Sequence, residues 1–180
     1  MTLHHPQEAE ANAAAYSGPA FICRDFNPDE DMNFVMHSYM KGFWEFGMRQ
    51  AGRKGGYPID CLQNADYGAN QKSVIENLLQ IGKCIVACPP DDHFLIFGYL
   101  IGELNQDHPV VHYVSVKSKY RRQGKAAGLI SEFENMHGGS PEGVRRRLIF
   151  SHWTDPWGAR LLEHLKKQGY APIWNPYLAR

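Results

Sequence analysis

Hydrophobic positions in the first half of the chain recur at the spacing of helices. Between Met32 and Met48 the apolar residues fall three or four positions apart, which predicts a helix with one buried face. The same spacing over residues 74–79 predicts a second helix. Ser73 and Glu76 have the spacing of a capping box for its start, and Gly82 is expected to end it.

The second half of the chain alternates between shorter apolar runs and turn signals. Clusters of glycine, proline, asparagine and aspartate separate these runs, as expected for strands joined by turns. Including a short first strand ahead of the helices, the predicted strands are Phe21–Cys23, Lys83–Cys88, Phe94–Glu103, Val110–Lys117, Arg146–Ser151 and Tyr170–Trp174. Two more helices are predicted, one through Ala126–Phe133 and one from Asp155 and Pro156 to Gly169.

The length and composition indicate one globular domain. The chain has 180 residues, of which 43% are hydrophobic and 21% charged, with a formal net charge of zero. We expect residues 1–17 to be a disordered tail and residues 18–180 to form the domain. A polar N-terminus and the lack of a long apolar run predict a cytoplasmic protein. The four cysteines are scattered, so no metal is expected.

One stretch of the chain departs from this neutral balance. Five lysines and arginines fall within residues 117–125, and no acidic residue occurs between His108 and Ser131. The stretch joins a predicted strand to a predicted helix. The first amides of a helix have no partner within the helix and lie at the positive end of its dipole. With Gly124 allowing close approach of the backbone, the stretch is suited to a phosphate-bearing ligand.

This stretch also resembles a known family. Arg121-x-x-Gly124-x-Ala126 matches the pyrophosphate loop of the GNAT superfamily of acyl-CoA-dependent N-acetyltransferases, and the predicted elements follow the same order. The resemblance implies an α+β fold with a mixed, mostly antiparallel sheet flanked by helices. It also implies transfer of an acetyl group from acetyl-CoA to a primary amine. By this resemblance the cofactor-binding residues are Val114 and Val116, which face the pantetheine, and Arg121, Arg122, Gln123, Gly124, Lys125, Ala126 and Ala127, around the pyrophosphate.

Two residues are candidates for the base that removes the amine proton. His112 lies four residues before Val116, where related arylalkylamine acetyltransferases carry a histidine, and an ordinary imidazole titrates near neutral pH. Glu103, at the end of the preceding strand, is the alternative and could act through water. A purely structural role is the competing interpretation for both. The order of elements further predicts that the strand with Val114 parts from the strand over 148–150, which opens a cleft for acyl-CoA.

The sequence departs from the family at the acid that protonates the leaving thiolate. Many members have Asn-x-x-Ala and then a tyrosine four residues before a Gly-aromatic pair. Here Asp155 replaces the asparagine, Ala159 is kept, and Leu165 stands where the tyrosine is expected before Gly169. Water could supply the proton instead. Ser151 and Tyr170 are the side-chain alternatives.

The acceptor and two competing functions stay open. Aromatic residues of the first two helices and their loop could line an acceptor pocket; these are Phe43, Trp44, Phe46, Tyr57 and Tyr67. The partner is then a small-molecule or protein amine, with no membrane, and a homodimer is compatible with this. One alternative is a catalytically silent acyl-CoA-binding domain. The other is a nucleic-acid-binding module using residues 117–125, which zero net charge disfavours.

Overall fold

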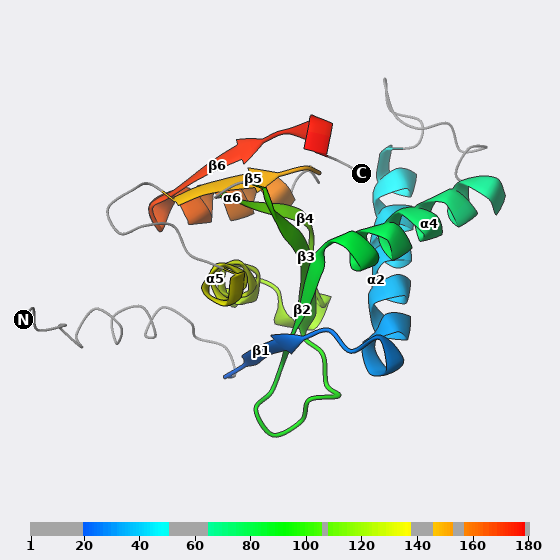
Figure 1. Cartoon of the computed structure of the whole chain (residues 1–180), viewed down its shortest axis with the longest axis horizontal. Coiled ribbons are helices and arrows are strands. Elements are labelled where there is room, and N and C mark those ends of the chain that lie inside the picture. The colour runs from blue at the N-terminus through cyan, green and yellow to red at the C-terminus, as the bar shows by residue number, and fades with distance from the viewer. Residues whose placement is uncertain (1–19, 51–64, 106–107, 138–145, 153–156, 179–180) are drawn as a thin grey trace, which may run out of the picture.

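A single six-stranded sheet organises the computed structural model (Figure 1). The structure describes residues 20–50, 65–105, 108–137, 146–152 and 157–178, so the expected tail, the loop with Tyr57, and Asp155 lie outside the described residues. The strands are β1 (Ile22–Asp25), β2 (Lys83–Cys88), β3 (Gly98–Asn105), β4 (His108–Val116), β5 (Arg146–Phe150) and β6 (Tyr170–Trp174).

The sheet is mixed and mostly antiparallel, as predicted. Its strands lie in sequence order from β1 to β6. The pairs β1–β2, β2–β3 and β3–β4 are antiparallel, whereas β4–β5 and β5–β6 are parallel. Each parallel pair is joined by a connection that contains a helix, as a crossover requires.

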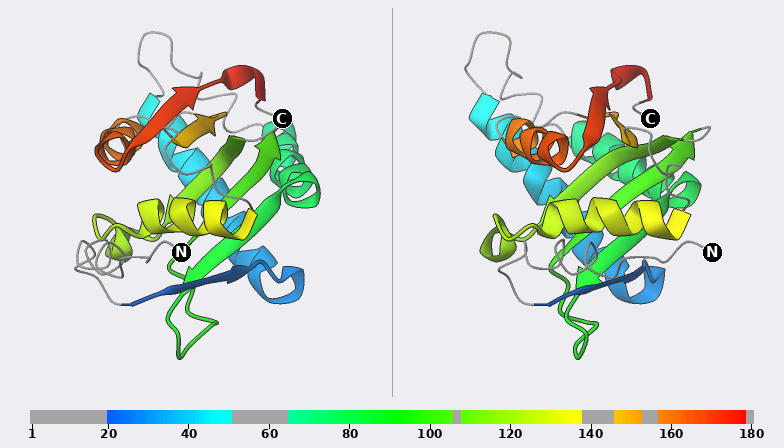
Figure 2. Two further views of the ribbon diagram at one scale, coloured as in Figure 1. Left: turned by 60° about the vertical axis from the view of Figure 1, so that its left-hand side comes forward. Right: turned by 90° about the vertical axis from the view of Figure 1, so that its left-hand side faces the viewer.

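Helices cover both faces of the sheet (Figure 2). The α-helices are α2 (Pro28–Gln50), α4 (Ala65–Ile81), α5 (Lys125–His137) and α6 (Trp157–Lys167), and short 3-10 turns are formed by η1 (Ser118–Tyr120) and η2 (Pro176–Leu178). Alternate residues of a strand face opposite sides. Accordingly Ile85 and Leu100 pack in a core with α5 and α6, whereas Val86 and Tyr99 pack in a second core with α2 and α4.

Two of the predicted boundaries are wrong. Ser73 is an exposed residue within α4, which begins at Ala65. The first turns of α4 have no fully buried side chain among the described residues, so they lack the apolar spacing that marks the rest of the helix. The third strand begins at Gly98, not Phe94. Residues before it form a turn in which an Asp92 carboxylate oxygen accepts hydrogen bonds from the amides of Phe94 and Leu95.

A close contact between β3 and β4 leads to a stability prediction. An added Cβ at Gly98 would lie 2.3 Å from the Ser115 carbonyl oxygen, which belongs to the backbone and cannot rotate away. We expect Gly98→Ala to lower the free energy of unfolding by about 1–3 kcal/mol, because the strands must separate. Gly68→Ala is the matched control, since nothing lies within 4 Å of its Cβ position in α4. Gly68→Ala should raise the free energy of unfolding by about 0.5–1 kcal/mol, because alanine favours a helix more than glycine does. Urea unfolding followed by circular dichroism measures both, and equal effects would contradict this account.

Candidate active site

The strands β4 and β5 part soon after they meet, as the sequence predicted. They pair only through Val110 with Ile149 and Val111 with Phe150, and the Ser151 amide then donates to the Val111 carbonyl at 3.2 Å. Beyond this point β4 continues to Val116, whereas β5 has ended. Within the described part of the chain, a stretch of the β4 edge is therefore left without a β-strand partner on that side.

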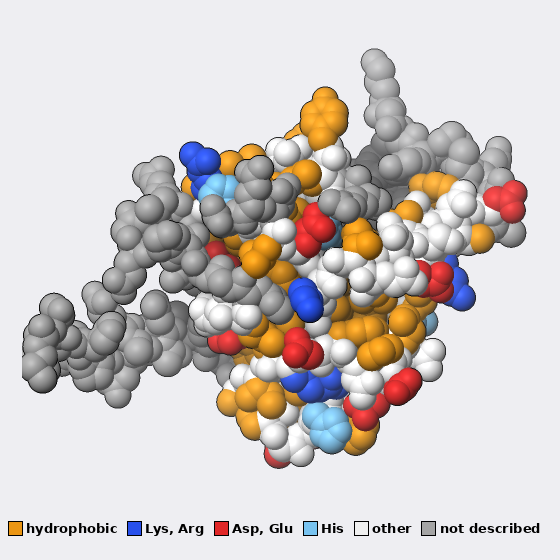
Figure 3. Space-filling view, viewed as in Figure 1, with side chains coloured by type: hydrophobic (Ala, Val, Ile, Leu, Met, Phe, Trp, Pro, Cys, Tyr) orange, Lys and Arg blue, Asp and Glu red, His pale blue; other side chains and the backbone are white. Residues whose placement is uncertain are grey.

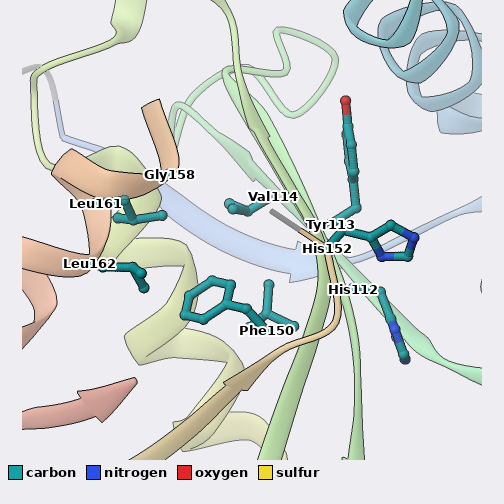
Figure 4. Close-up of a pocket in the computed structure, with 9 residues that line it drawn as sticks. His112, Tyr113, Val114, Phe150, His152, Gly158, Leu161 and Leu162 are labelled. Atoms are coloured by element: carbon teal, nitrogen blue, oxygen red, sulfur yellow. The ribbon is translucent and has the colours of Figure 1, made fainter. Parts of the chain in front are cut away.

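A cavity lies at this point of separation (Figure 4). Its floor and walls come from β4, the end of β5 and the first turns of α6. Apolar side chains lie on one side of the view and His112, Tyr113 and His152 on the other. The lining residues are Val111, His112, Tyr113, Val114, Phe150, His152, Gly158, Leu161 and Leu162. Val114 thus lines the cavity, whereas the Val116 side chain is buried in the core beside α5.

A bulge in β4 sets the position of His112. In the register with β3, Tyr113 pairs with Ile101 but Val111 pairs with Gly102, so His112 is an extra residue without its own register partner. Bulges turn side chains out of the regular alternation and often lie beside functional sites. The consequence here is that His112 reaches residues of both neighbouring strands.

The structure brings the two candidate bases together. The His112 side chain is fully buried, and its Nε2 lies 3.5 Å from Glu103 Oε1 on β3. This separation suits an ion pair but is long for a hydrogen bond. On the other side, His112 Nδ1 lies 2.9 Å from the Ser151 hydroxyl oxygen. Both ring nitrogens of His112 therefore face oxygen atoms.

The sequence reasoning missed His152. Its Nδ1 lies 2.9 Å from the same Ser151 oxygen, and its ring is exposed and lines the cavity. Partial burial lowers the pKa of His152, while a hydrogen bond with the His112 backbone acts in the opposite direction. The signal was present, since Ser151 and His152 directly follow a buried strand at the predicted parting.

The basic loop has the backbone geometry of an anion site. Arg122 has a φ of 63° and Gly124 a φ of 71°, so both are left-handed. Left-handed residues within a turn are typical of backbone concavities that bind anions. The first bond of the α5 ladder runs from the Gly128 amide to the Gly124 carbonyl at 2.9 Å. The amides of residues 125–127 therefore occupy the helix N-terminus, at its positive end.

Side chains of the loop fix its shape. The Arg121 guanidinium donates from Nε to the Val116 carbonyl at 2.9 Å, and the Gln123 amide donates to the Lys119 carbonyl at 3.2 Å. Lys125 is only 2% exposed, with its Nζ 4.3 Å from the centre of the Phe21 ring. Burial lowers the pKa of Lys125. Only its backbone amide is therefore placed to meet a phosphate.

The residue at the position of the family's acid cannot donate a proton. Leu165 is fully buried in the core beneath α6. Tyr170, one of the two side-chain alternatives, donates its hydroxyl to Glu134 on α5 at 2.6 Å, and both residues are buried. Ser151, the other alternative, lies between His112 and His152. Of these groups, Ser151 and its neighbours lie nearest to the cavity.

Aromatic residues of the sheet and α2 gather on the α2 side of β4. Tyr113 packs against Tyr39 and Tyr99, with ring centres 5.0 and 5.8 Å apart. Its hydroxyl lies against Gly42 of α2, where an added Cβ would be 2.8 Å away. Burial raises the pKa of Tyr113 to about 12, so this hydroxyl stays protonated at neutral pH. The side chains of Phe43 and Phe46 lie outside the described residues.

The cysteines of the described chain are free thiols. Cys84 and Cys88 are buried and Cys23 is partly buried, and burial raises the pKa of all three. Over the described ranges, no three His, Cys, Asp or Glu side chains are grouped so that they could hold a metal ion. Nor does any helix in the described part of the chain have the length and apolar character needed to cross a membrane.

Solved structures show which fold this is. A protein from Pyrococcus furiosus, provisionally named an acetyl transferase, aligns with 84% of this chain and 93% of its own at a TM-score of 0.53 and 14% identity. Ribosomal-protein-alanine N-acetyltransferase from Brucella melitensis biovar Abortus 2308 aligns with 89% of this chain and 99% of its own chain. The TM-score is 0.50 and the sequence identity is 16%. A GCN5-related glucosamine N-acetyltransferase region of a fungal multi-domain β-N-acetylglucosaminidase aligns with 85% of this chain and 17% of the fungal chain. The TM-score is 0.50 and the sequence identity is 18%.

These likenesses establish that the chain has the fold of the GNAT acetyltransferases. They agree with the resemblance carried by Arg121, Gly124 and Ala126 and with the order of elements. No family model matches the chain, and no curated protein matches it either.

Proposed function

We propose that this chain is an acetyltransferase that moves the acetyl group of acetyl-CoA to a primary amine. The observation that carries the proposal is the position of the cavity and the basic loop on one strand. The parted edge of β4, with Val114, ends at Val116, and the left-handed loop at Arg122 and Gly124 follows within eight residues. A thioester in the cavity and a pyrophosphate at the loop could thus belong to one extended ligand.

The chain's own groups suit acetyl-CoA as the substrate. In the proposal, backbone groups of Val114 and Val116 bond the pantetheine arm, as unpaired strand edges readily do. The amides from Arg122 to Ala127 bind the pyrophosphate, supported by the helix dipole and nearby cations. Arg121 shapes the loop through the Val116 carbonyl, so that carbonyl is already engaged and the Val114 backbone has the larger share.

We propose that the base that removes the amine proton belongs to the side-chain group around His112 and Glu103. Direct attack needs a neutral amine, because an ammonium nitrogen has no lone pair. The amine nitrogen bonds to the thioester carbonyl carbon, the carbon–sulfur bond breaks, and the thiolate takes up a proton. His112 is completely buried. It therefore needs an intermediary to reach an amine in the cavity.

The nucleic-acid alternative is less compatible with this geometry. Lys117 packs over the Phe34 ring of α2 at 4.6 Å, whereas Lys125 packs over Phe21 on the other face of the sheet. The basic stretch is therefore divided between two faces. On the side seen in Figure 3, acidic and basic side chains are interspersed. A binding surface for nucleic acid is normally continuous and basic.

Two measurements test the proposal. Calorimetry should show binding of free coenzyme A and of acetyl-CoA at micromolar strength. A coenzyme A release assay with saturating acetyl-CoA should then show turnover with at least one member of a panel of small amines and peptides. No heat from either ligand, with a folded protein, would contradict the proposal. Binding without turnover on any amine would favour the catalytically silent alternative.

The panel of amines in the release assay would identify the acceptor. The names of the Brucella and fungal neighbours indicate different amines, a protein alanine and glucosamine. At 16–18% identity neither acceptor transfers to this chain.

A further inference from the structure

The group around His112 extends farther than a single base requires. Four side chains follow one another from β3 to the cavity. Glu103 faces His112 at 3.5 Å, His112 faces Ser151 at 2.9 Å, and Ser151 faces His152 at 2.9 Å. Exposure changes along the series, because His112 and Ser151 are each 2% exposed, whereas His152 is exposed in the cavity.

The positions of the hydrogens follow from counting donors. A carboxylate accepts hydrogen bonds and cannot donate them. The carboxylate 3.5 Å from Nε2 electrostatically favours the Nε2–H form of a neutral His112, whose Nδ1 then accepts from the Ser151 hydroxyl. That hydroxyl has one hydrogen, so it has none left for His152. We assign the hydrogen of His152 to Nδ1, since this nitrogen faces the Ser151 oxygen at 2.9 Å, and this assignment leaves the lone pair on Nε2.

We propose that His152 is the catalytic base that contacts the amine, and that Ser151, His112 and Glu103 form a proton relay behind it. The inference rests on the proposed acetyltransferase function. It assigns the direct contact to a residue that is exposed in the cavity and makes His112 a positioning residue. His112 then acts on the amine through Ser151 and His152 without touching it.

Every proton that moves in the relay has a stated donor and acceptor. An ammonium proton moves to His152 Nε2, His152 passes its Nδ1 hydrogen to Ser151, and Ser151 passes its hydroxyl hydrogen to His112 Nδ1. His152 ends neutral, and the positive charge ends on His112 beside Glu103. The freed amine forms the carbon–nitrogen bond, the carbon–sulfur bond breaks, and the amide nitrogen gives its surplus proton to the thiolate. Products are the amide, the free thiol and protonated His112.

Electrostatics favour this direction of transfer. A charge on His112 is buried but has the Glu103 carboxylate 3.5 Å away. The lowered pKa of His152 means that it is neutral at neutral pH and ready to accept. Among the described residues, His112 and Tyr113 of β4 line the cavity beside His152, Glu103 of β3 faces His112, and the cavity-lining residues of α6 carry no charge. Turnover should therefore fall as acid protonates His152, with a midpoint below the ordinary histidine value.

Three measurements test the relay, and the first needs no activity. Long-range nitrogen–proton NMR of the unliganded protein near pH 7.5 should find His152 as the Nδ1–H tautomer and His112 as the Nε2–H tautomer. The opposite pair of tautomers would overturn the proposal, whatever the fate of the acetyltransferase assay.

The second measurement replaces the exposed end. His152→Asn keeps a donor near the position of Nδ1 but cannot accept a proton. We expect about a 10²-fold lower turnover number and loss of the acid limb of the pH–rate profile, with unchanged coenzyme A affinity. If the wild-type protein acetylates an amine and this variant keeps its rate and profile, the relay is refuted while the proposed function stands. If the wild-type protein acetylates no amine, the proposed function and the relay fail together.

The third measurement removes the middle of the relay. In mixtures of light and heavy water, the rate of the wild-type protein should depend on deuterium content along a curve, since several protons move together. Ser151→Ala should lower turnover about tenfold and make the dependence linear. A linear dependence in the wild-type protein would overturn the relay, because a purely structural Ser151 does not change the number of protons in flight.

Discussion

Replacing His112 with alanine is expected to lower the turnover number by about 10²–10⁴-fold, with little change in acetyl-CoA binding. The range is the usual loss when acid–base catalysis is removed. The substitution removes the imidazole between Ser151 and Glu103, so a proton taken up at the cavity no longer has a buried acceptor beside the carboxylate. The acid limb of the pH–rate profile should move or vanish as well. Steady-state kinetics from pH 5 to 9, with calorimetry for the coenzyme, measure these effects.

Two controls separate this effect from damage to the core. His112→Gln retains side-chain volume and an amide that can bond Glu103, so its stability should be close to that of the wild-type protein while turnover stays low. His93→Ala removes an exposed histidine whose ring packs on Phe94, and it should leave turnover unchanged. Near-normal turnover of His112→Ala with an unchanged profile would make His112 a packing residue. The remaining candidates would then be His152 without a relay behind it and Glu103 acting through water.

Much of the fold could be predicted from the sequence because the two cores take alternate residues of each interior strand. Val86 and Tyr99 face α2 and α4, while Ile85 and Leu100 face α5. The strands of the sheet interior are thus apolar on both faces, and residues 84–88 of β2 appear in the sequence as an unbroken apolar run. The prediction failed at Phe94, which is apolar but 68% exposed in a turn held by Asp92. Apolar character alone could not distinguish the turn from the strand.

The candidate site was only partly readable for a different reason. Spacing along one strand placed His112 and Val114, and a motif placed the loop at Gly124. The contact between His112 and Ser151 joins residues 39 positions apart and depends on a bulge at His112 and a two-residue pairing of β4 with β5. Neither feature has a signature in the order of residues. The sequence places Ser151 and His152 directly after β5, but their link to His112 became visible only when the strands were placed side by side.

Replacing Gly124 with valine is expected to weaken coenzyme A binding more than tenfold, which corresponds to about 1.4 kcal/mol or more. Gly124 has a φ of 71°, a conformation that strongly disfavours a β-branched residue. The new side chain would also stand where the backbone must approach a phosphate. Gly169→Val is the matched control, since Gly169 has a φ of 88° but closes α6 and has no atom within 4 Å of its Cβ position. Both variants should unfold at lower temperature because of backbone strain. Only Gly124→Val should lose affinity in calorimetry, and equal affinities for the two variants would remove the loop from the binding site.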